Sequence, residues 1–74
     1  MNQRVEMGQR LKALREANNM TRADLSERLG LSVTFIGQVE SGARSPKVFR
    51  LIELSYIFKV SIDYILGVDK KRNV

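Results

Sequence analysis

Two short amphipathic helices are predicted by the stretch Met20-Thr-Arg-Ala-Asp-Leu-Ser-Glu-Arg-Leu-Gly-Leu-Ser-Val-Thr-Phe-Ile-Gly-Gln-Val-Glu-Ser-Gly42. A tight turn at Gly30-Leu31-Ser32 joins them, because Gly30 stands where the chain must reverse and a positive φ is easy for glycine. A three-residue turn of this kind holds two helices at a steep angle. The pattern is that of a helix-turn-helix, so DNA is the first partner to consider.

Both helices of this motif have recognisable start signals. Thr21 is the predicted N-cap of the first helix, with Asp24 in capping-box register, and Ser32 is the predicted N-cap of the second. Apolar pairs in hydrophobic-staple positions flank the two caps, namely Met20 with Leu25 and Leu31 with Ile36. We therefore expect both helices to have fixed entry angles.

A helix is also predicted on the N-terminal side of the motif, from about Glu6 to about Asn18. Apolar residues recur there at three- and four-residue spacing, as Met7, Leu11, Leu14 and Ala17. Asn18 and Asn19 are expected to end it, because asparagine tolerates a left-handed cap better than other non-glycine residues do.

Two more helices are predicted on the C-terminal side. Ser45-Pro46 offers an N-cap followed by proline at the first helical position, with the helix continuing through about Phe58. Ser61 is the predicted cap of a last short helix, Ile62 to Leu66, which Gly67 stops. With short loops and no predicted strand, the chain is expected to be all-α, a compact five-helix bundle.

Length and composition limit the classes of function. Seventy-four residues predict one small domain over 1–68, followed by a frayed basic tail over 69–74, with no room for a ligand-sensing domain. The chain has no cysteine and no histidine, so we expect neither disulfides nor a metal site, and no cofactor. There is no signal peptide and no membrane-length apolar run, which favours a cytoplasmic protein.

The net charge of +5 attracts acidic partners, and its distribution favours nucleic acid over a membrane surface. Arg22 opens the first helix of the motif, while Arg44 and Lys47 lie on either side of Ser45-Pro46. A membrane role would rest on Lys70-Lys71-Arg72 alone. The alternative, that these are solvated surface charges, applies to each basic residue taken singly.

The helix after Ser45 is apolar on more than one side, so some of its side chains must meet something other than a single small core. A second copy of the chain is the economical candidate, with an interface that includes Tyr56, Ile62 and Tyr64. The alternative is that a small domain simply leaves apolar atoms exposed.

Base-reading residues are predicted on the outward face of the helix that follows Ser32. Gln38 could pair with adenine N6 and N7, and Thr34 and Val33 could contact a thymine methyl or a base edge. Glycine at position 37 makes the helix less stable by roughly 1 kcal/mol than alanine would. Its presence is explained either by close approach to DNA or by neutral drift. Phe35 is open between core packing and a thymine contact.

Phosphate contacts are predicted from basic and hydroxyl side chains and from the N–H groups at the helix starts. The residues assigned to this role are Thr21, Arg22, Ser41, Arg44, Ser45 and Lys47. These contacts would hold the protein in register on the duplex rather than select a sequence. Glu40 lies beside the core face of its helix and requires a cationic partner, because an unpaired buried carboxylate is strongly destabilising.

Over about Gly8 to Gly67 the chain resembles the phage repressor and Cro-like helix-turn-helix regulators, the xenobiotic-response-element family. The resemblance rests on Gly8-Gln-Arg-Leu-Lys-Ala-Leu-Arg15, Thr21-x-x-Asp-Leu25, Leu29-Gly-Leu-Ser32, Ile36, Val39-Glu-Ser-Gly42, Arg44-Ser-Pro46 and Val60-Ser-Ile-Asp-Tyr-Ile-Leu66. It implies a lambda-repressor-like five-helix domain that binds operator DNA as a dimer, with the last helix near the two-fold axis.

The same resemblance implies an internal ion pair between Arg15 and Glu40. Ser26 departs from the family, which most often has alanine there, and serine should fit if its hydroxyl finds a nearby carbonyl. The recognition face is individual to this chain, so the resemblance implies no particular operator.

The leading hypothesis is a sequence-specific transcriptional regulator, most simply a repressor, that binds a pseudo-palindrome as a homodimer with half-sites about 34 Å apart. A second hypothesis is a protein-interaction module, or an antitoxin- or controller-type regulator, whose last two helices bind a regulatory partner polypeptide. An enzyme is not expected, because Ser41, Ser45 and Ser61 fit helix-end positions better than a catalytic site.

Overall fold

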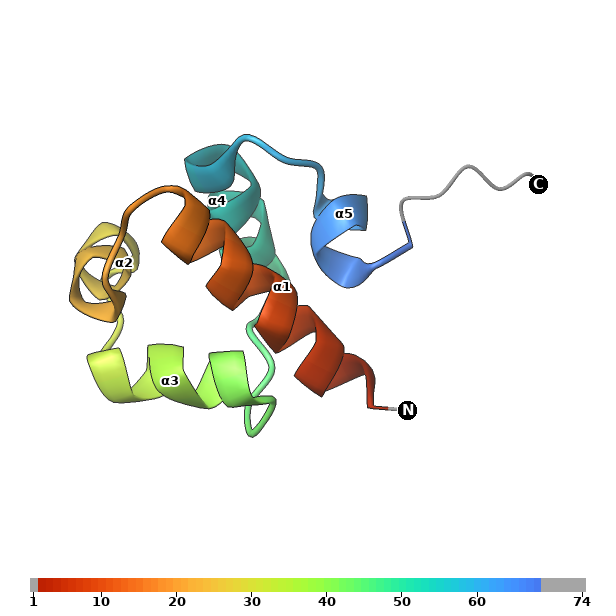
Figure 1. Ribbon diagram of the computed structural model, residues 1–74, viewed down its shortest axis with the longest axis horizontal. Helices are drawn as coiled ribbons and strands as arrows, with labels where there is room; N and C mark the ends of the chain where they lie inside the picture. The colour runs from red at the N-terminus through yellow and green to blue at the C-terminus, as the bar shows by residue number, and fades with distance from the viewer. Residues whose placement is uncertain (1, 69–74) are drawn as a thin grey trace.

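The computed structural model describes residues 2–68, which form five helices and no strand. The helices are α1 (Gln3–Ala17), α2 (Arg22–Leu29), α3 (Val33–Ser41), α4 (Val48–Phe58) and α5 (Ile62–Leu66), drawn in Figure 1. The expected all-α, five-helix architecture is confirmed over this part of the chain. The predicted basic tail, 69–74, lies outside the described residues.

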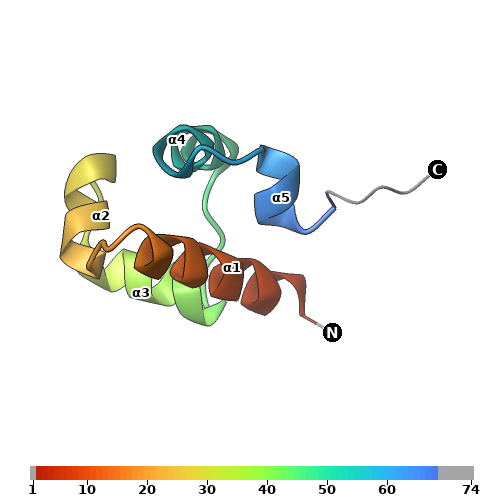
Figure 2. The same cartoon turned by 45° about the horizontal axis from the view of Figure 1, so that its top comes forward.

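Helix α1 runs through the middle of the molecule and packs against α3 on one side and α5 on the other. Helix α2 is seen end-on in Figure 1 while α3 lies across the view, so the two cross steeply, as a helix-turn-helix requires. The turned view in Figure 2 shows α1 and α3 side by side in the lower part of the molecule and α4 above them. The core lies between these layers.

The core is small and apolar, and all five helices contribute to it. Its buried members are Met7, Leu11, Leu25, Leu29, Ile36, Val39, Leu51, Leu54, Phe58 and Ile65. Ile65 is completely buried, which makes the short α5 an integral part of the bundle rather than an appendage. Ala17, which continues the apolar spacing of α1 in sequence, is exposed.

Three predicted helix starts are confirmed in atomic detail. Thr21 Oγ1 accepts a hydrogen bond from Asp24 N at 3.0 Å, and Asp24 Oδ2 accepts one from Thr21 N at 2.9 Å, which completes the capping box. Ser32 caps α3 through Phe35 N, and Ser61 caps α5 through Tyr64 N, each at 3.0 Å. These caps satisfy N–H groups that a helix leaves free at its first turn.

The predicted start of α1 is wrong by three residues. The helix begins at Gln3, because Asn2 Oδ1 accepts hydrogen bonds from Arg4 N at 3.0 Å and Val5 N at 3.3 Å. The added residues are mostly polar, so apolar periodicity gave no sign of them. The predicted end is confirmed, since Asn18 is the C-cap and Asn19 takes a left-handed φ of 58°.

The predicted start of α4 at Ser45-Pro46 is also wrong. The N-cap is Lys47, which makes no side-chain cap hydrogen bond, and the helix begins at Val48. Pro46 instead lines the apolar space between α3 and α4. The backbone is extended at Lys47, directly before the helix, and Ser45 is exposed without a capping role.

Two arginines join distant helix ends. Arg10 on α1 donates through Nε to Ile65 O at 2.8 Å, and Arg50 on α4 donates through Nη1 to Leu29 O at 2.7 Å. Each bond satisfies a carbonyl that the last turn of α5 or α2 would leave free. Part of the basic character of the chain therefore serves the fold rather than a partner.

Helices α1 and α3 approach each other closely at Gly8, which is buried. A Cβ at this position would lie 2.4 Å from Val39 O and 2.5 Å from Glu40 O, which is closer than real atoms tolerate. Glycine is therefore required for the backbones to meet. We call this contact, together with the Glu40 ion pairs described below, the α1–α3 seam.

Candidate nucleic-acid interface

Helix α3 has one face turned into the bundle and one turned outward. Ile36, Val39 and Glu40 are buried, as the helical projection predicts for the first two. The residues on the other side are small or polar: Val33, Thr34 and Ser41 are exposed, while Gly37 and Gln38 are half-buried. The four predicted base readers therefore share one accessible face of a capped helix.

Glu40 is held by two arginines from two other helices. Arg15 Nε donates to Glu40 Oε2 at 2.6 Å and Arg15 Nη2 donates to Oε1 at 3.1 Å, so the implied ion pair is present and bidentate. Arg22 Nε donates to the same Oε1 at 3.0 Å. Arg15 Nη1 also donates to Met20 O at 2.8 Å, which ties the loop before α2 to the cluster.

The protonation of this cluster follows from its geometry. Burial alone would raise the pKa of the Glu40 carboxyl, but hydrogen bonds from Arg15 and then Arg22 outweigh it, and the pKa lies below the ordinary value. The hydrogen bond to Glu40 in turn raises the pKa of Arg15, against the smaller effect of burial. The cluster is therefore fully charged near neutral pH, which fixes α3 to α1 and α2.

The predicted phosphate-contacting residues lie in two places. Thr21 and Arg22 are exposed at the start of α2, where Thr21 already serves in the capping box and Arg22 pairs with Glu40. Ser41 ends α3, and its hydroxyl donates to Gln38 O at 3.1 Å. The other three, Arg44, Ser45 and Lys47, are exposed in the α3–α4 connection. The N–H groups predicted at Ser45 belong instead to the start of α4 after Lys47.

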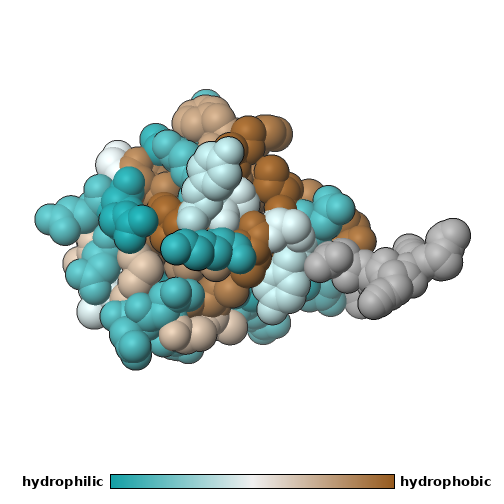
Figure 3. Space-filling view, turned by 90° about the horizontal axis from the view of Figure 1, so that it is seen from above, coloured by the Kyte–Doolittle hydropathy of each residue, from teal (hydrophilic) through white to brown (hydrophobic). Residues whose placement is uncertain are grey.

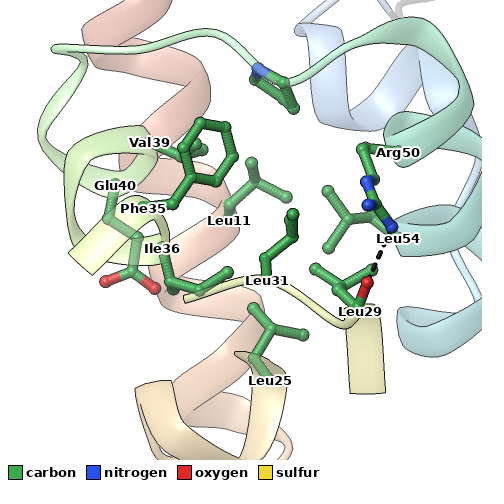
Figure 4. Close-up of a pocket in the computed structure, with 11 residues that line it drawn as sticks. Leu11, Leu25, Leu29, Leu31, Phe35, Ile36, Val39, Glu40, Arg50 and Leu54 are labelled. Atoms are coloured by element: carbon green, nitrogen blue, oxygen red, sulfur yellow. Dashed lines mark hydrogen bonds between the residues drawn. The ribbon is translucent and has the colours of Figure 1, made fainter. Parts of the chain in front are cut away.

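The sequence leaves open whether Phe35 packs in the core or contacts DNA, and the structure favours the core. It is half-buried, packs against the core, and lines a narrow apolar space between the helix-turn-helix and α4. Figure 4 shows its ring among leucines, with the Glu40 carboxylate turned away from them and Arg50 bonded to Leu29 O. The structure thus places Phe35 with the core rather than with the outward face.

That apolar space is a small packing gap and is too small to be a ligand site. It has a volume of about 20 Å³, which is room for about one water. Small-molecule sites are larger, on the order of 300 Å³ or more. Within residues 2–68 no three acidic side chains come together in a way that could hold a metal ion, and none of the helices there has both the length and the apolar character needed to cross a membrane.

A second surface is apolar and lies on α4 and α5. Of the three residues predicted at an interface, Tyr56 is 79% exposed and Tyr64 is 43% exposed, whereas Ile62 is half-buried and packs against the core. Further exposed apolar residues on these helices and the segment after them are Val48, Phe49, Ile52, Leu66 and Val68. Figure 3, viewed from the α4 side, shows apolar side chains at the surface among polar ones. We call this set with Tyr56 and Tyr64 the α4–α5 surface.

The arrangement of α2 and α3 is matched by known proteins. A helix-turn-helix family matches residues 11–65, which run from α1 into α5. The chain belongs to this family. The family consists of DNA-binding transcription regulators, so the expectation that the chain is not an enzyme is confirmed, as is the resemblance to helix-turn-helix regulators.

Relatives and a solved structure agree with this assignment. The chain is 37% identical over 81% of its length to an uncharacterized HTH-type transcriptional regulator, YobD, of Bacillus subtilis (strain 168), covering 54% of that protein. It is 32% identical over 89% of its length to the HTH-type transcriptional regulator ImmR of the same organism, covering 52% of it. The chain thus spans about half the length of these relatives.

The solved structure is that of the restriction-modification controller protein C.AhdI from Aeromonas hydrophila. The two folds agree with a TM-score of 0.75 at 28% sequence identity, over 82% of this chain and 92% of that one. This likeness independently supports the helix-turn-helix fold.

Proposed function

We propose that this helix-turn-helix chain is a sequence-specific transcriptional regulator of the repressor type, which binds a pseudo-palindromic operator as a homodimer in the cytoplasm. The observation that carries the proposal is the two-sided character of α3. Ile36, Val39 and Glu40 fix the helix to the bundle, while Val33, Thr34 and Gln38 stay accessible on its outer face. An α-helix presented in this way fits the major groove, where base edges can be distinguished.

In this proposal Gln38 reads adenine, Thr34 and Val33 contact thymine methyls or base edges, and Gly37 permits close approach. Within residues 2–68 no hydrogen bond occupies the Gln38 side-chain amide, which leaves it available to a base. Arg44 and Lys47 are exposed and without an ion-pair partner among the described residues, which suits them to phosphate. Thr21, Ser41 and Ser45 would add polar contacts to the backbone of the duplex.

The homodimer is supported by the α4–α5 surface. Several exposed apolar side chains on two helices of so small a domain suit a self-complementary contact about a two-fold axis. Two copies would then read half-sites about one helical turn, roughly 34 Å, apart. Symmetry in the bound DNA would report the dimer directly.

Selection of bound duplexes from a random pool tests this function. We expect a recovered consensus with two-fold symmetry. Gln38→Ala should weaken binding to that consensus by about 1–3 kcal/mol with little effect on random DNA, because it removes a base contact. Arg44→Ala is the matched control: it should weaken binding to every sequence similarly and reduce the salt slope by about 1. Equal losses on specific and random DNA for Gln38→Ala would remove its reading role.

A second candidate function is binding of a regulatory polypeptide to the α4–α5 surface, as in an antitoxin- or controller-type regulator. The likeness to a restriction-modification controller protein and the 79% exposure of Tyr56 favour it. A DNA titration distinguishes the two candidate functions. Steeply salt-dependent binding to a short duplex supports the regulator, whereas no binding at low salt combined with a tight heteromeric complex supports the interaction module.

A further inference from the structure

Arg22 is both accessible and held by an ion pair, which distinguishes it from Arg44 and Lys47, the other basic residues predicted to contact phosphate, within the described residues. It is the first residue of α2, and its Nε donates to Glu40 Oε1 at 3.0 Å. Glu40 is itself 3% exposed and held by Arg15, so its position is set by the bundle, whereas the Arg22 side chain is 46% exposed. An exposed guanidinium is thus oriented by a buried carboxylate.

The tip of this guanidinium lies over the outer face of α3. A Cβ on Gly37 would be 3.6 Å from Arg22 Nη1 and 3.9 Å from Cζ, so the guanidinium occupies the space beside the glycine. Gly37 shares its face with Thr34 and Gln38, the predicted base readers. The side chain from α2 therefore extends the reading surface of α3 beside Gly37.

The donors that remain on Arg22 form a planar pair. Nε is engaged by Glu40, and within residues 2–68 no hydrogen bond engages Nη1 or Nη2. Two parallel N–H donors match guanine O6 and N7, and arginine to guanine is the commonest specific contact in the major groove. Because Glu40 already restricts the side chain, less conformational freedom is lost when it binds.

The electrostatics favour a base over a phosphate. The Glu40 carboxylate, 3.0 Å from Arg22 Nε, offsets part of the charge through which arginine attracts phosphate. A guanine edge is neutral and needs directed donors rather than net charge. We propose that Arg22, held by Glu40 over Gly37, is a base-reading residue that donates to a guanine in each half-site, and not a phosphate anchor as its sequence position first predicts. This inference rests on the proposed DNA-binding function.

Duplex selection with the wild type, Arg22→Lys and Arg22→Ala tests the inference. Lysine keeps the positive charge but has no planar pair of donors, so it can replace arginine at a phosphate and cannot replace it at guanine O6 and N7. We expect a wild-type consensus with a guanine in each half-site whose preference over other bases falls roughly 5- to 150-fold in both variants. The preferences attributed to Thr34 and Gln38 should persist, and Arg44→Ala should leave the whole consensus unchanged.

Three outcomes would overturn the inference. A consensus without guanine would show that Arg22 does not read this base. Full retention of the guanine preference by Arg22→Lys would show that Arg22 is a phosphate anchor. The same holds for an Arg22→Ala variant that loses affinity for all sequences equally. If the wild type selects no consensus at all, the proposed function fails together with this inference. If it selects a consensus that does not depend on Arg22, only this inference fails. Circular dichroism checks that each variant folds, and the lysine variant alone suffices if the alanine variant does not.

Discussion

Helices α3 and α4 are held to the bundle in different ways. For α3, the α1–α3 seam relies on a backbone contact at Gly8 and on a buried carboxylate bound by two arginines. Helix α4 is held through Leu51, Leu54 and Phe58, which belong to the apolar core, beside a small apolar space of about 20 Å³. Contacts of the first kind require particular residues at particular distances, whereas apolar contacts accept residues of similar volume.

This difference has a functional meaning. In the proposed function, α3 is the element whose position must be reproducible, because base contacts depend on hydrogen-bond geometry. Its position is set by directional contacts to α1 and α2. Helix α4 is held by apolar contacts, and its exposed residues in the α4–α5 surface are available to a partner or a second copy. Four substitutions or conditions can break or sharpen this contrast.

The largest expected effect is that of Arg15→Met. It leaves the Glu40 carboxylate buried with its half-exposed partner Arg22 alone, and removing one member of a buried ion pair typically destabilises by about 3–5 kcal/mol. Urea unfolding of the purified domain measures this loss. The matched control is Arg22→Met, which removes the more exposed partner and should destabilise by at most about 1 kcal/mol. Similar small losses for both would mean that the seam does not depend on the buried pair.

Acidification should remove part of the same contribution. The folded-state pKa of Glu40 lies below its ordinary value of 4.5, so its stabilisation is complete above about pH 4.5 and is lost as the pH falls through the folded-state pKa. The lowered pKa of Asp24, caused by its backbone and side-chain hydrogen bonds with Thr21, acts in the same direction below its ordinary value of 3.8. Unfolding of the wild type and of Glu40→Gln should therefore differ at pH 7 and converge toward pH 3. A difference that stays constant with pH would contradict this origin.

Gly8→Ala should be the next most damaging change. Its Cβ would lie 2.4 Å from Val39 O, so the helices must move apart, and overpacking of this kind typically destabilises by about 1–3 kcal/mol. The control is Gly37→Ala on the outer face, where a Cβ has ordinary contact distances and helix propensity improves by up to about 1 kcal/mol. Opposite shifts in thermal midpoint are expected, and a tolerated Gly8→Ala would show that the backbones are not in close contact.

The smallest effect compares two serines that look alike in sequence. Ser32→Ala removes the α3 cap and should destabilise by about 1 kcal/mol. Ser45→Ala, at a position without a capping role, should change the free energy of unfolding by less than about 0.5 kcal/mol. Equal losses would indicate that Ser45 caps α4 after all.

Local signals in the sequence predicted most helix ends correctly. The capping box of Thr21 and Asp24, the cap at Ser61 and the left-handed glycines Gly30 and Gly67 are as expected. Each of these features depends on hydrogen bonds or φ preferences within a few residues, so neighbours in sequence suffice to reveal it. The inward direction of Ile36 and Val39 also follows from helical spacing alone.

The candidate site was predicted less completely. Helical spacing placed the predicted base readers on one face of α3, but it gave no reason to place Arg22 over Gly37, since their contact depends on how α2 crosses α3. The predicted start of α4 was wrong for a similar reason, because Pro46 lies against side chains from other helices. Helical spacing also does not reveal which neighbour a short helix will meet, so the packing of Ile62 against the core is visible only in the structure.

The sequence by itself determined where most helices begin and end, which face of α3 is apolar, and the family to which the chain belongs. Those properties arise from periodicity and from bonds between near neighbours. The tertiary structure alone decided that Gly8 must be a glycine, that Arg10 and Arg50 serve distant carbonyls, and that Glu40 binds a second arginine. These contacts join residues far apart in the chain, so they exist only once the helices have packed.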